Sequence, residues 1–370
     1  MKIIKHILYS NKNFHWLAAF LVCAVAGLSW FIFSTTTADV IENELRAKIS
    51  GIYSVINDIV PATADMENVE LPAEYDLLLE EERLLNREYS MRIMENYRQL
   101  VNVRQELLAN ETQLSAHQQE NPDLYATDFL YDPLTVAQDT AKYDQFAQSN
   151  RAFDPAVDDQ VTLFKRTLSG LLSFSLLLLA IFNASLLLSL RSLHGLGYNL
   201  PVIPDRLFTR ILLNRLAKGA GLHLLALALL SAIFLSGTQG RLLTYPTPIF
   251  YQGNFLTLPL LGYVALLIGG SLLSVVLLTL VQVVLNLFVR NQYVTLLSGC
   301  FWLLLSYATF SSNYFTVFSS LLRFDRVLAG SAGLSLLAWL LVIVLLIASC
   351  AGLFIAGIYR RQKQMKGIIL

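Results

Sequence analysis

The chain has 370 residues, of which 55% are hydrophobic and only 15% are charged. Soluble domains carry about 25% charged residues, so the composition excludes an ordinary soluble protein and predicts an integral membrane protein. The net charge is zero, but the charges are separated along the chain: residues 39–161 hold 25 of the 27 acidic and 9 of the 27 basic residues, a net of −16, and the remainder carries +16. Two compartments are therefore indicated within one chain.

Residues 1–34 combine a Lys-rich start with an uncharged apolar run from Trp16 to Phe33. These eighteen residues are just enough to span about 30 Å of hydrocarbon. A cleaved signal peptide shares both features, but its apolar core is usually about 7–15 residues long and is followed by an A-x-A site, which is absent here. We expect a first transmembrane helix, with the Lys-rich N-terminus in the cytoplasm.

Residues 35–165 are hydrophilic, and they should form an extracytoplasmic α-helical domain inserted between the first two spans. One helix is expected from Asp39 to Ile59 and a shorter one from Thr135 to Gln148. Between them, Tyr75 to Gln119 contains no Pro or Gly and keeps an apolar stripe, as one long helix or a helical hairpin would. The stripe consists of Leu78, Leu85, Tyr89, Ile93, Tyr97, Leu100, Leu107 and Leu114.

The Asn121-Pro122 pair should end this pattern, and Asp154-Pro155 should introduce a last helix that enters the membrane. The acidic surplus of the domain could attract cationic substrates, but a solvated surface explains it more simply.

Residues 166–370 should form the other five spans, which gives an all-α membrane protein with six transmembrane helices. The five apolar runs are Leu168–Leu190, Ala220–Leu235, Leu258–Val289, Tyr293–Phe310 and Gly330–Ile358. Six spans return the C-terminus to the cytoplasm, and the short inner loops and tails then hold 13 Lys and Arg against 3 in the short outer loops. The outer segment Ser311–Ala329 is too apolar for a free loop, so we expect it to lie along the membrane interface or to re-enter the membrane.

Four polar residues lie within the apolar runs, where an unpaired polar group is costly. They should face other helices, where interhelical hydrogen bonds are ordinary, or a substrate path; we favour helix packing. These residues are Asn183, His223, Gln282 and Asn286.

No enzymatic or metal-binding pattern is present. The five His residues are scattered without an HExxH motif, and the three Cys lie in apolar runs. There is no GxxxxGK(S/T) motif, so the chain cannot hold a nucleotide through a P-loop. An intramembrane Ser/His hydrolase would need a convergent pair, which the sequence does not indicate.

The largest polar island after the second span runs from Arg191 to Lys218. Pro201 and Pro204 favour extended backbone, and Asp205 suits the start of a helix. From there Arg206, Arg210, Asn214 and Lys218 recur at four-residue steps and form one polar stripe. Residues 201–218 are therefore expected to form an amphipathic helix on the cytoplasmic membrane surface.

This arrangement resembles the permease subunit of an ABC-2 type exporter. The resemblance rests on the order of spans and domains and on the segment LPVIPDRLFTRILLNRLAK. It implies that the amphipathic helix docks on a separate ABC ATPase, and that the residues responsible are Leu200, Pro201, Pro204, Asp205, Arg206, Leu207, Phe208 and Arg210.

The resemblance further implies two ATPase copies, which would bind ATP and Mg²⁺, and a second permease copy or paralogue. The chain itself would hold no cofactor, would not be an enzyme and would bind no nucleic acid. It would lie in a bacterial cytoplasmic membrane and export an amphipathic peptide, lipid or drug. The alternative is a membrane sensor or envelope scaffold whose external helical domain binds a ligand or partner.

Overall fold

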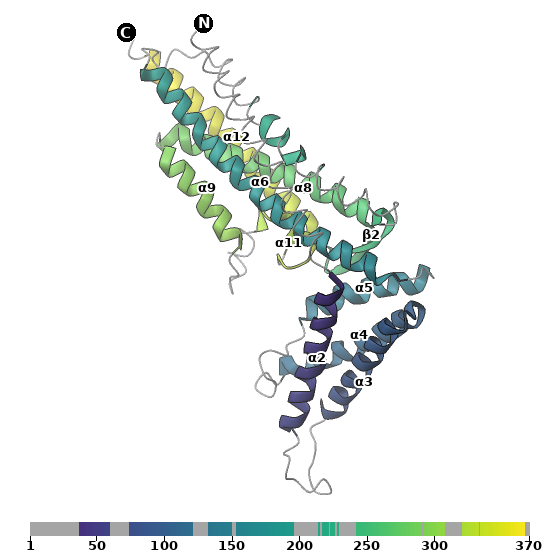
Figure 1. The fold of residues 1–370 in the computed structure, drawn as a ribbon. Coiled ribbons are helices and arrows are strands. Elements are labelled where there is room, and N and C mark those ends of the chain that lie inside the picture. The colour runs from purple at the N-terminus through teal and green to yellow at the C-terminus, as the bar shows by residue number, and fades with distance from the viewer. Residues whose placement is uncertain are drawn as a thin grey trace.

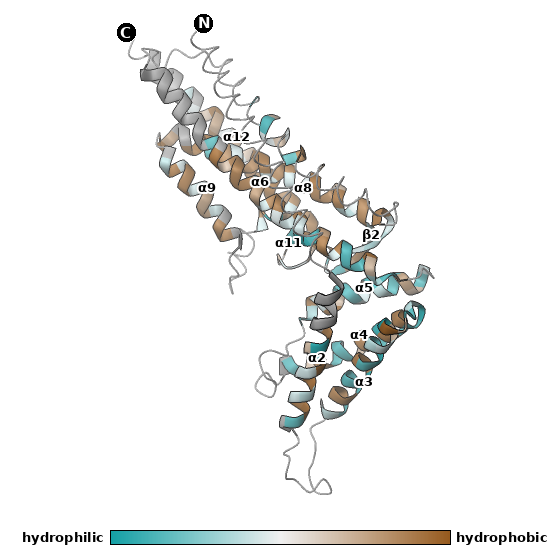
Figure 2. Cartoon of the chain, viewed as in Figure 1, coloured by the Kyte–Doolittle hydropathy of each residue, from teal (hydrophilic) through white to brown (hydrophobic). Residues whose placement is uncertain are grey.

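The computed structural model describes residues 37–59, 74–120, 132–149, 153–195, 242–289, 292–307, 320–332 and 334–366, with a few residues between 214 and 228. Four long helices, α6 (Pro155–Gly195), α8 (Leu260–Val289), α9 (Gln292–Tyr307) and α12 (Leu336–Lys366), form an elongated bundle (Figure 1). At one end of the bundle lie α2 (Thr37–Ile59), α3 (Glu74–Ile93), α4 (Tyr97–Glu120) and α5 (Pro133–Ser149). We call α2 to α5 the polar domain, because hydrophilic residues gather there and apolar ones on the bundle (Figure 2).

Three helices in the described part of the chain are long and apolar enough to cross a membrane, which makes this a membrane protein. They are Pro155–Ile181 in α6, Leu260–Leu285 in α8 and Leu336–Gly357 in α12. They correspond to the second, fourth and sixth predicted spans. The fifth corresponds to α9, whose apolar part is shorter, and the first and most of the third lie outside the described residues. The total of six spans therefore stays a prediction.

The polar domain contains a helical hairpin, which is the second of the two arrangements predicted for its long apolar stripe. Helices α3 and α4 are joined by three residues, Met94 to Asn96, of which Glu95 has a φ of 54°. The stripe faces inward on both helices: Leu78, Leu85, Leu100, Leu107 and Leu114 are fully buried. Ile93 is exposed because it is the last residue of α3, at the turn.

The expectation of a purely α-helical fold is wrong at one point. Two antiparallel strands, β1 (Pro246–Tyr251) and β2 (Asn254–Pro259), precede α8, with Pro246 opposite Pro259 and Tyr251 opposite Asn254. The two turn residues, Gln252 and Gly253, both have positive φ, at 50° and 88°, as a tight two-residue hairpin turn requires. The fourth apolar run consequently begins its helix at Leu260 rather than at Leu258, which belongs to β2.

One hydrophobic core continues from the polar domain into the bundle. It joins Leu100, Val101 and Leu108 of α4 and the aromatic residues of α5 to buried residues of α6, β1, α8, α11 and α12. A smaller core lies between α2, α3 and α4, around Ile52 and Leu85. Helix α4 therefore contributes one face to each core, and this attaches the polar domain to the bundle through apolar packing.

The described part of the predicted outer segment, residues 320–329, is packed onto the bundle rather than free. It contains the short helix α11 (Phe324–Leu328). The ring of Phe324 lies 4.4 Å from that of Trp339 on α12, centroid to centroid. The hydroxyl of Ser274 on α8 donates to the carbonyl of Leu321 at 2.9 Å, and the indole of Trp339 donates to Ser320 O at 3.2 Å.

A polar cluster fixes the same segment to α6. The Ser169 hydroxyl donates to Asp325 Oδ2 at 2.6 Å, and the Arg323 guanidinium donates to Ser169 Oγ at 2.9 Å. Arg323 also pairs with Asp325 at 2.6 Å, with both side chains nearly buried. The segment therefore contacts α6, α8 and α12 together.

This packing predicts opposite effects at two neighbouring glycines of α8. A Cβ at Gly270 would overlap the ring of Phe324, whereas a Cβ at Gly269 meets nothing within 4 Å. Gly270→Ala should therefore destabilise the fold by about 1–3 kcal/mol, because Phe324 must move. Gly269→Ala should be neutral or stabilising by up to about 1 kcal/mol, because Ala favours the helix. The free energy of unfolding of each variant is measured in mixed detergent micelles. Equal changes in that free energy for the two variants would contradict the packing of Phe324 on Gly270.

Candidate functional site

The residues predicted to dock on an ATPase lie outside the described part of the chain. They are Leu200, Pro201, Pro204, Asp205, Arg206, Leu207, Phe208 and Arg210. The element that leads to them is described: α6 runs without interruption from Pro155 to Gly195, five residues before Leu200.

Two of the four predicted intramembrane polar residues are in direct contact. The Asn183 amide on α6 donates to Gln282 Oε1 on α8 at 2.9 Å and to Thr279 Oγ1 at 3.2 Å. The Gln282 amide in turn donates to the carbonyl of Ala180 at 3.3 Å. Both side chains are buried, and a Cβ at Gly299 of α9 would overlap Gln282 Nε2. The cluster therefore joins three helices, as the packing interpretation predicts; the side chain of Asn286 lies outside the described residues.

The third predicted residue, His223, pairs with a serine that the sequence did not single out. Its Nδ1 lies 2.7 Å from Ser175 Oγ on α6, and both side chains are buried. Ser175 also donates to the carbonyl of Leu172 at 2.8 Å. The other ring nitrogen, Nε2, is buried and has no hydrogen-bond partner among the described residues. A polar atom left unsatisfied inside a protein needs an explanation, such as an ordered water or a ligand group.

The described contacts of this Ser/His pair differ from those of a serine hydrolase. In a serine hydrolase an acidic group holds the second imidazole nitrogen, which orients the base toward the nucleophile. None of the described carboxylates holds Nε2, and Ser175 Oγ donates to Leu172 O in its own helix. The geometry fits a polar helix contact better than a nucleophile.

The Asn183 contact should be measurable by a double-mutant cycle. Asn183→Leu and Gln282→Leu should each cost about 1–2 kcal/mol, because each leaves the other amide short of a buried partner. The double variant should cost less than the sum, with a coupling energy of about 0.6–1.7 kcal/mol. Unfolding in mixed micelles provides the measurement.

Ser271→Ala is the matched control, because the Ser271 hydroxyl bonds only within α8, to Ile268 O. It should have little effect. Additive costs for Asn183→Leu and Gln282→Leu would show that the two amides do not interact.

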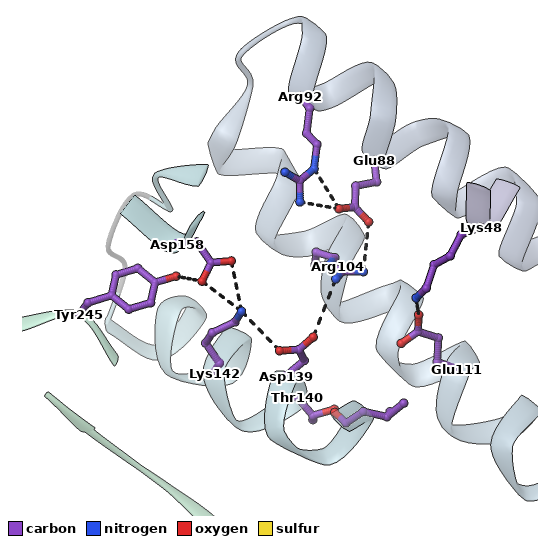
Figure 3. A network of polar contacts seen from close by, with 11 residues as sticks. Lys48, Glu88, Arg92, Arg104, Glu111, Asp139, Thr140, Lys142, Asp158 and Tyr245 are labelled. Atoms are coloured by element: carbon purple, nitrogen blue, oxygen red, sulfur yellow. Dashed lines mark hydrogen bonds and ion pairs between the residues drawn. The ribbon is translucent and has the colours of Figure 1, made fainter. Parts of the chain in front are cut away.

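A second set of polar residues lies where the polar domain meets α6, and it forms a continuous ladder of alternating charges (Figure 3). Glu88 on α3 pairs with Arg92 at 2.9 Å and with Arg104 on α4 at 3.2 Å. Arg104 reaches Asp139 on α5 at 3.9 Å, and Asp139 pairs with Lys142 at 3.4 Å. We call this set, with the two residues described next, the charge ladder.

The ladder continues from α5 to α6 and to the loop before β1. Lys142 pairs with Asp158 on α6 at 3.2 Å, and the Tyr245 hydroxyl donates to Asp158 at 2.5 Å. A separate ion pair, Lys48 to Glu111 at 3.1 Å, joins α2 to α4 (Figure 3). Three cations and three anions alternate, so the ladder is neutral within a strongly acidic domain.

Neighbouring charges hold Asp139 and Lys142 of the ladder in their ionised forms. Burial raises the pKa of the Asp139 carboxyl, but attraction by Lys142 and Arg104 outweighs burial and holds that pKa below its ordinary value of 3.8. Burial lowers the pKa of the Lys142 ammonium, but attraction by Asp158 outweighs it, and that pKa lies above 10.5. Burial is the largest cause that raises the pKa of the Tyr143 hydroxyl, whose ring lies under Lys142.

These shifts predict a wide pH range of stability. The pKa of Asp139 is lower in the folded state than in the unfolded state, so the stabilisation from this group is present above the unfolded-state pKa and is lost as the pH falls through the folded-state pKa. The pKa of Lys142 is higher in the folded state, so its stabilisation is present below the unfolded-state pKa and is lost as the pH rises through the folded-state pKa. The difference in unfolding temperature between the native chain and Asp139→Asn should stay constant from about pH 5 to 9 and shrink below about pH 4. Calorimetry in detergent measures it, and a difference that vanishes near neutral pH would contradict the assignment.

The sequence analysis did not identify the ladder. Its only signal is that Arg92, Arg104 and Lys142 are three of just nine cations among 25 acidic residues, and that they lie within predicted helices. Which acid each one meets depends on how the helices pack.

The polar domain also has an open groove of about 480 Å³ between α2 and α3. Arg46, Ile49, Ser50 and Tyr53 of α2 line one side, and Asn86 and Tyr89 of α3 line the other. The Arg46 guanidinium lies over the Tyr89 ring and donates to its hydroxyl at 2.9 Å. No cluster of His, Cys, Asp or Glu in the described residues could hold a metal ion.

Comparison of the chain with protein-family models, with curated proteins and with solved structures finds no match.

Proposed function

We propose that the chain is the membrane-spanning subunit of an ATP-driven exporter, and that a separate ATPase drives it through the segment 201–218. The chain would be a transport subunit rather than an enzyme, with ATP and Mg²⁺ bound on the partner. It would lie in a bacterial cytoplasmic membrane, with residues 35–165 outside and both termini inside.

The observation that carries this proposal is the continuity of α6. Its 41 residues extend about 60 Å, from the charge ladder at Asp158 to Gly195, just before the predicted docking segment. The helix has no internal proline, so a displacement at one end is carried to the other. A transporter driven mechanically by a partner needs such an element.

The hydrogen bonds of α6 support the same proposal. Along one helix, Ser169 contacts the segment before α12, Ser175 contacts His223, and Asn183 contacts α8. Polar contacts between apolar helices are specific in geometry, because an amide in hydrocarbon has few alternative partners. A movement of α6 would therefore reach each neighbouring helix.

The rival function, a sensor with an external ligand domain, is favoured by the groove between α2 and α3. Its volume falls in the range of small-molecule sites, and aromatic rings with a few polar groups line it. It is open and bounded by only six residues, however, and the groove does not account for a helix that continues through the bundle.

The test first asks whether a gene beside that of this chain encodes an ATPase with a GxxxxGK(S/T) motif, and then co-expresses that ATPase with the tagged chain. We expect it to co-purify, and its ATPase rate to rise when the chain is present in nanodiscs. Reversing two charges of the docking segment, Arg206→Glu with Arg210→Glu, should abolish both effects, because these cations lie on the polar stripe.

A matched control reverses two C-terminal cations, Lys363→Glu with Lys366→Glu, and should leave co-purification and stimulation unchanged. Coupling that survives the reversal at Arg206 and Arg210 would refute the docking assignment. A chain without effect on the ATPase would refute the transporter assignment.

A further inference from the structure

We propose that α5 acts as a clamp: it joins the rest of the polar domain to α6, so that the two move as a single rigid body. The ion pairs of Lys142 hold this connection together. A change in the tilt of α6 would then swing the α3–α4 hairpin with it. The inference does not depend on which partner drives α6, or on whether the chain transports anything.

Helix α5 is hydrogen-bonded both to the polar domain and to the bundle. Toward the polar domain, Asp139 pairs with Arg104 of α4 and Gln105 of α4 donates to Asp144 at 2.8 Å. Toward the bundle, Gln138 donates to the carbonyl of Ala329 at 2.7 Å. The amide oxygen of Gln145 accepts from Thr257 of β2 at 3.1 Å. The helix is therefore bonded on both sides.

An aromatic cluster fills the space behind these polar contacts. Tyr143 and Phe146 of α5 pack on Phe153, with ring centroids 5.4 Å apart in each case. Phe146 also meets the ring of Tyr245 at 5.3 Å. Phe153 directly precedes Asp154, whose carboxylate accepts from the backbone N–H of Ala156 and so caps α6. The start of α6 is thus set by the packing of α5.

Lys142 links the two halves of the ladder. Its ammonium lies between Asp139 of α5 and Asp158 of α6, and over the Tyr143 ring at 4.8 Å. The side chain is 12% exposed, so water cannot replace its partners easily. Without it, the carboxylates of Asp139 and Asp158 would lose their shared cation in a partly buried site, where like charges repel.

Other ion pairs of the polar domain do not have this role. Arg83 and Glu80 pair within α3 and are 70% and 40% exposed, so the pair joins no two elements and is screened by water. Arg87 and Glu106 join α3 to α4, but both are about half exposed. Arg83 therefore provides a matched control for Lys142: one cation removed from the same domain, without loss of an interhelical contact.

The experiment measures the distance between the two bodies in the full chain. Spin labels are attached at Ala109→Cys on α4 and Gly170→Cys on α6, after Cys23, Cys300 and Cys350 are replaced by serine. Both label sites are exposed, and a Cβ at Gly170 meets nothing within 4 Å. Pulsed electron paramagnetic resonance in nanodiscs then reports the distribution of distances between α4 and α6.

We expect one narrow distribution in the parent chain and in Arg83→Met. Lys142→Met should broaden it about twofold or more, because opening of the clamp lets the polar domain move separately. Asp158→Asn should also broaden the distance distribution. This substitution preserves the volume of the side chain and an acceptor for Tyr245, and so tests the clamp with a milder change.

A hydrogen-exchange measurement on α8 and α12 identifies any variant that fails to fold. Narrow distributions in both Lys142→Met and Asp158→Asn would overturn the clamp. Broadening by Arg83→Met as large as that by Lys142→Met would overturn the role of Lys142. Because no ATPase is present, either failure is distinguishable from a failure of the proposed transport function.

Discussion

The charge ladder between the polar domain and α6 is the interaction on which the arrangement of this protein depends. Partial burial gives it that importance: Glu88 is buried and the other charged members are 12–29% exposed, so water screens them less than it screens exposed ion pairs, which contribute about 0–1 kcal/mol. Each inner member of the ladder joins two helices, from Glu88 and Arg104 to Lys142 and Asp158. A domain with a net negative charge is thereby held together by neutral local pairing.

Apolar packing and the ladder act on the same elements. The larger core is continuous from α4 through α5 to α6, α8 and α12, so the polar domain is not an independent module tethered to a bundle. Tyr143 and Phe146 of α5 belong to this core and pack on Phe153, beside the ion pairs of the ladder. Helix α6 belongs to both parts.

The two polar sites have different physical origins. Asn183 and Gln282 could be selected from the sequence, because an amide in an apolar run is costly unless another helix satisfies it. Their pairing with each other, and the pairing of His223 with Ser175, required the tertiary structure, since Ser is frequent in these runs and each has a backbone carbonyl available in its own helix. The ladder could not be selected at all, because charged residues on polar helices are usually solvated.

Local physics accounts for what the sequence by itself determined: the membrane class, the polar domain, and the positions of α2, α5, α6, α8 and α12. Apolar run length, helical periodicity and Pro or Asp at helix starts are properties of neighbouring residues, and they suffice for these elements. Tertiary structure decided three things: the break of the long stripe at Glu95, the strand pair before α8, and the ladder. A left-handed residue, a strand partner and a buried counter-ion are each stabilised by groups distant in sequence, so no local pattern specifies them.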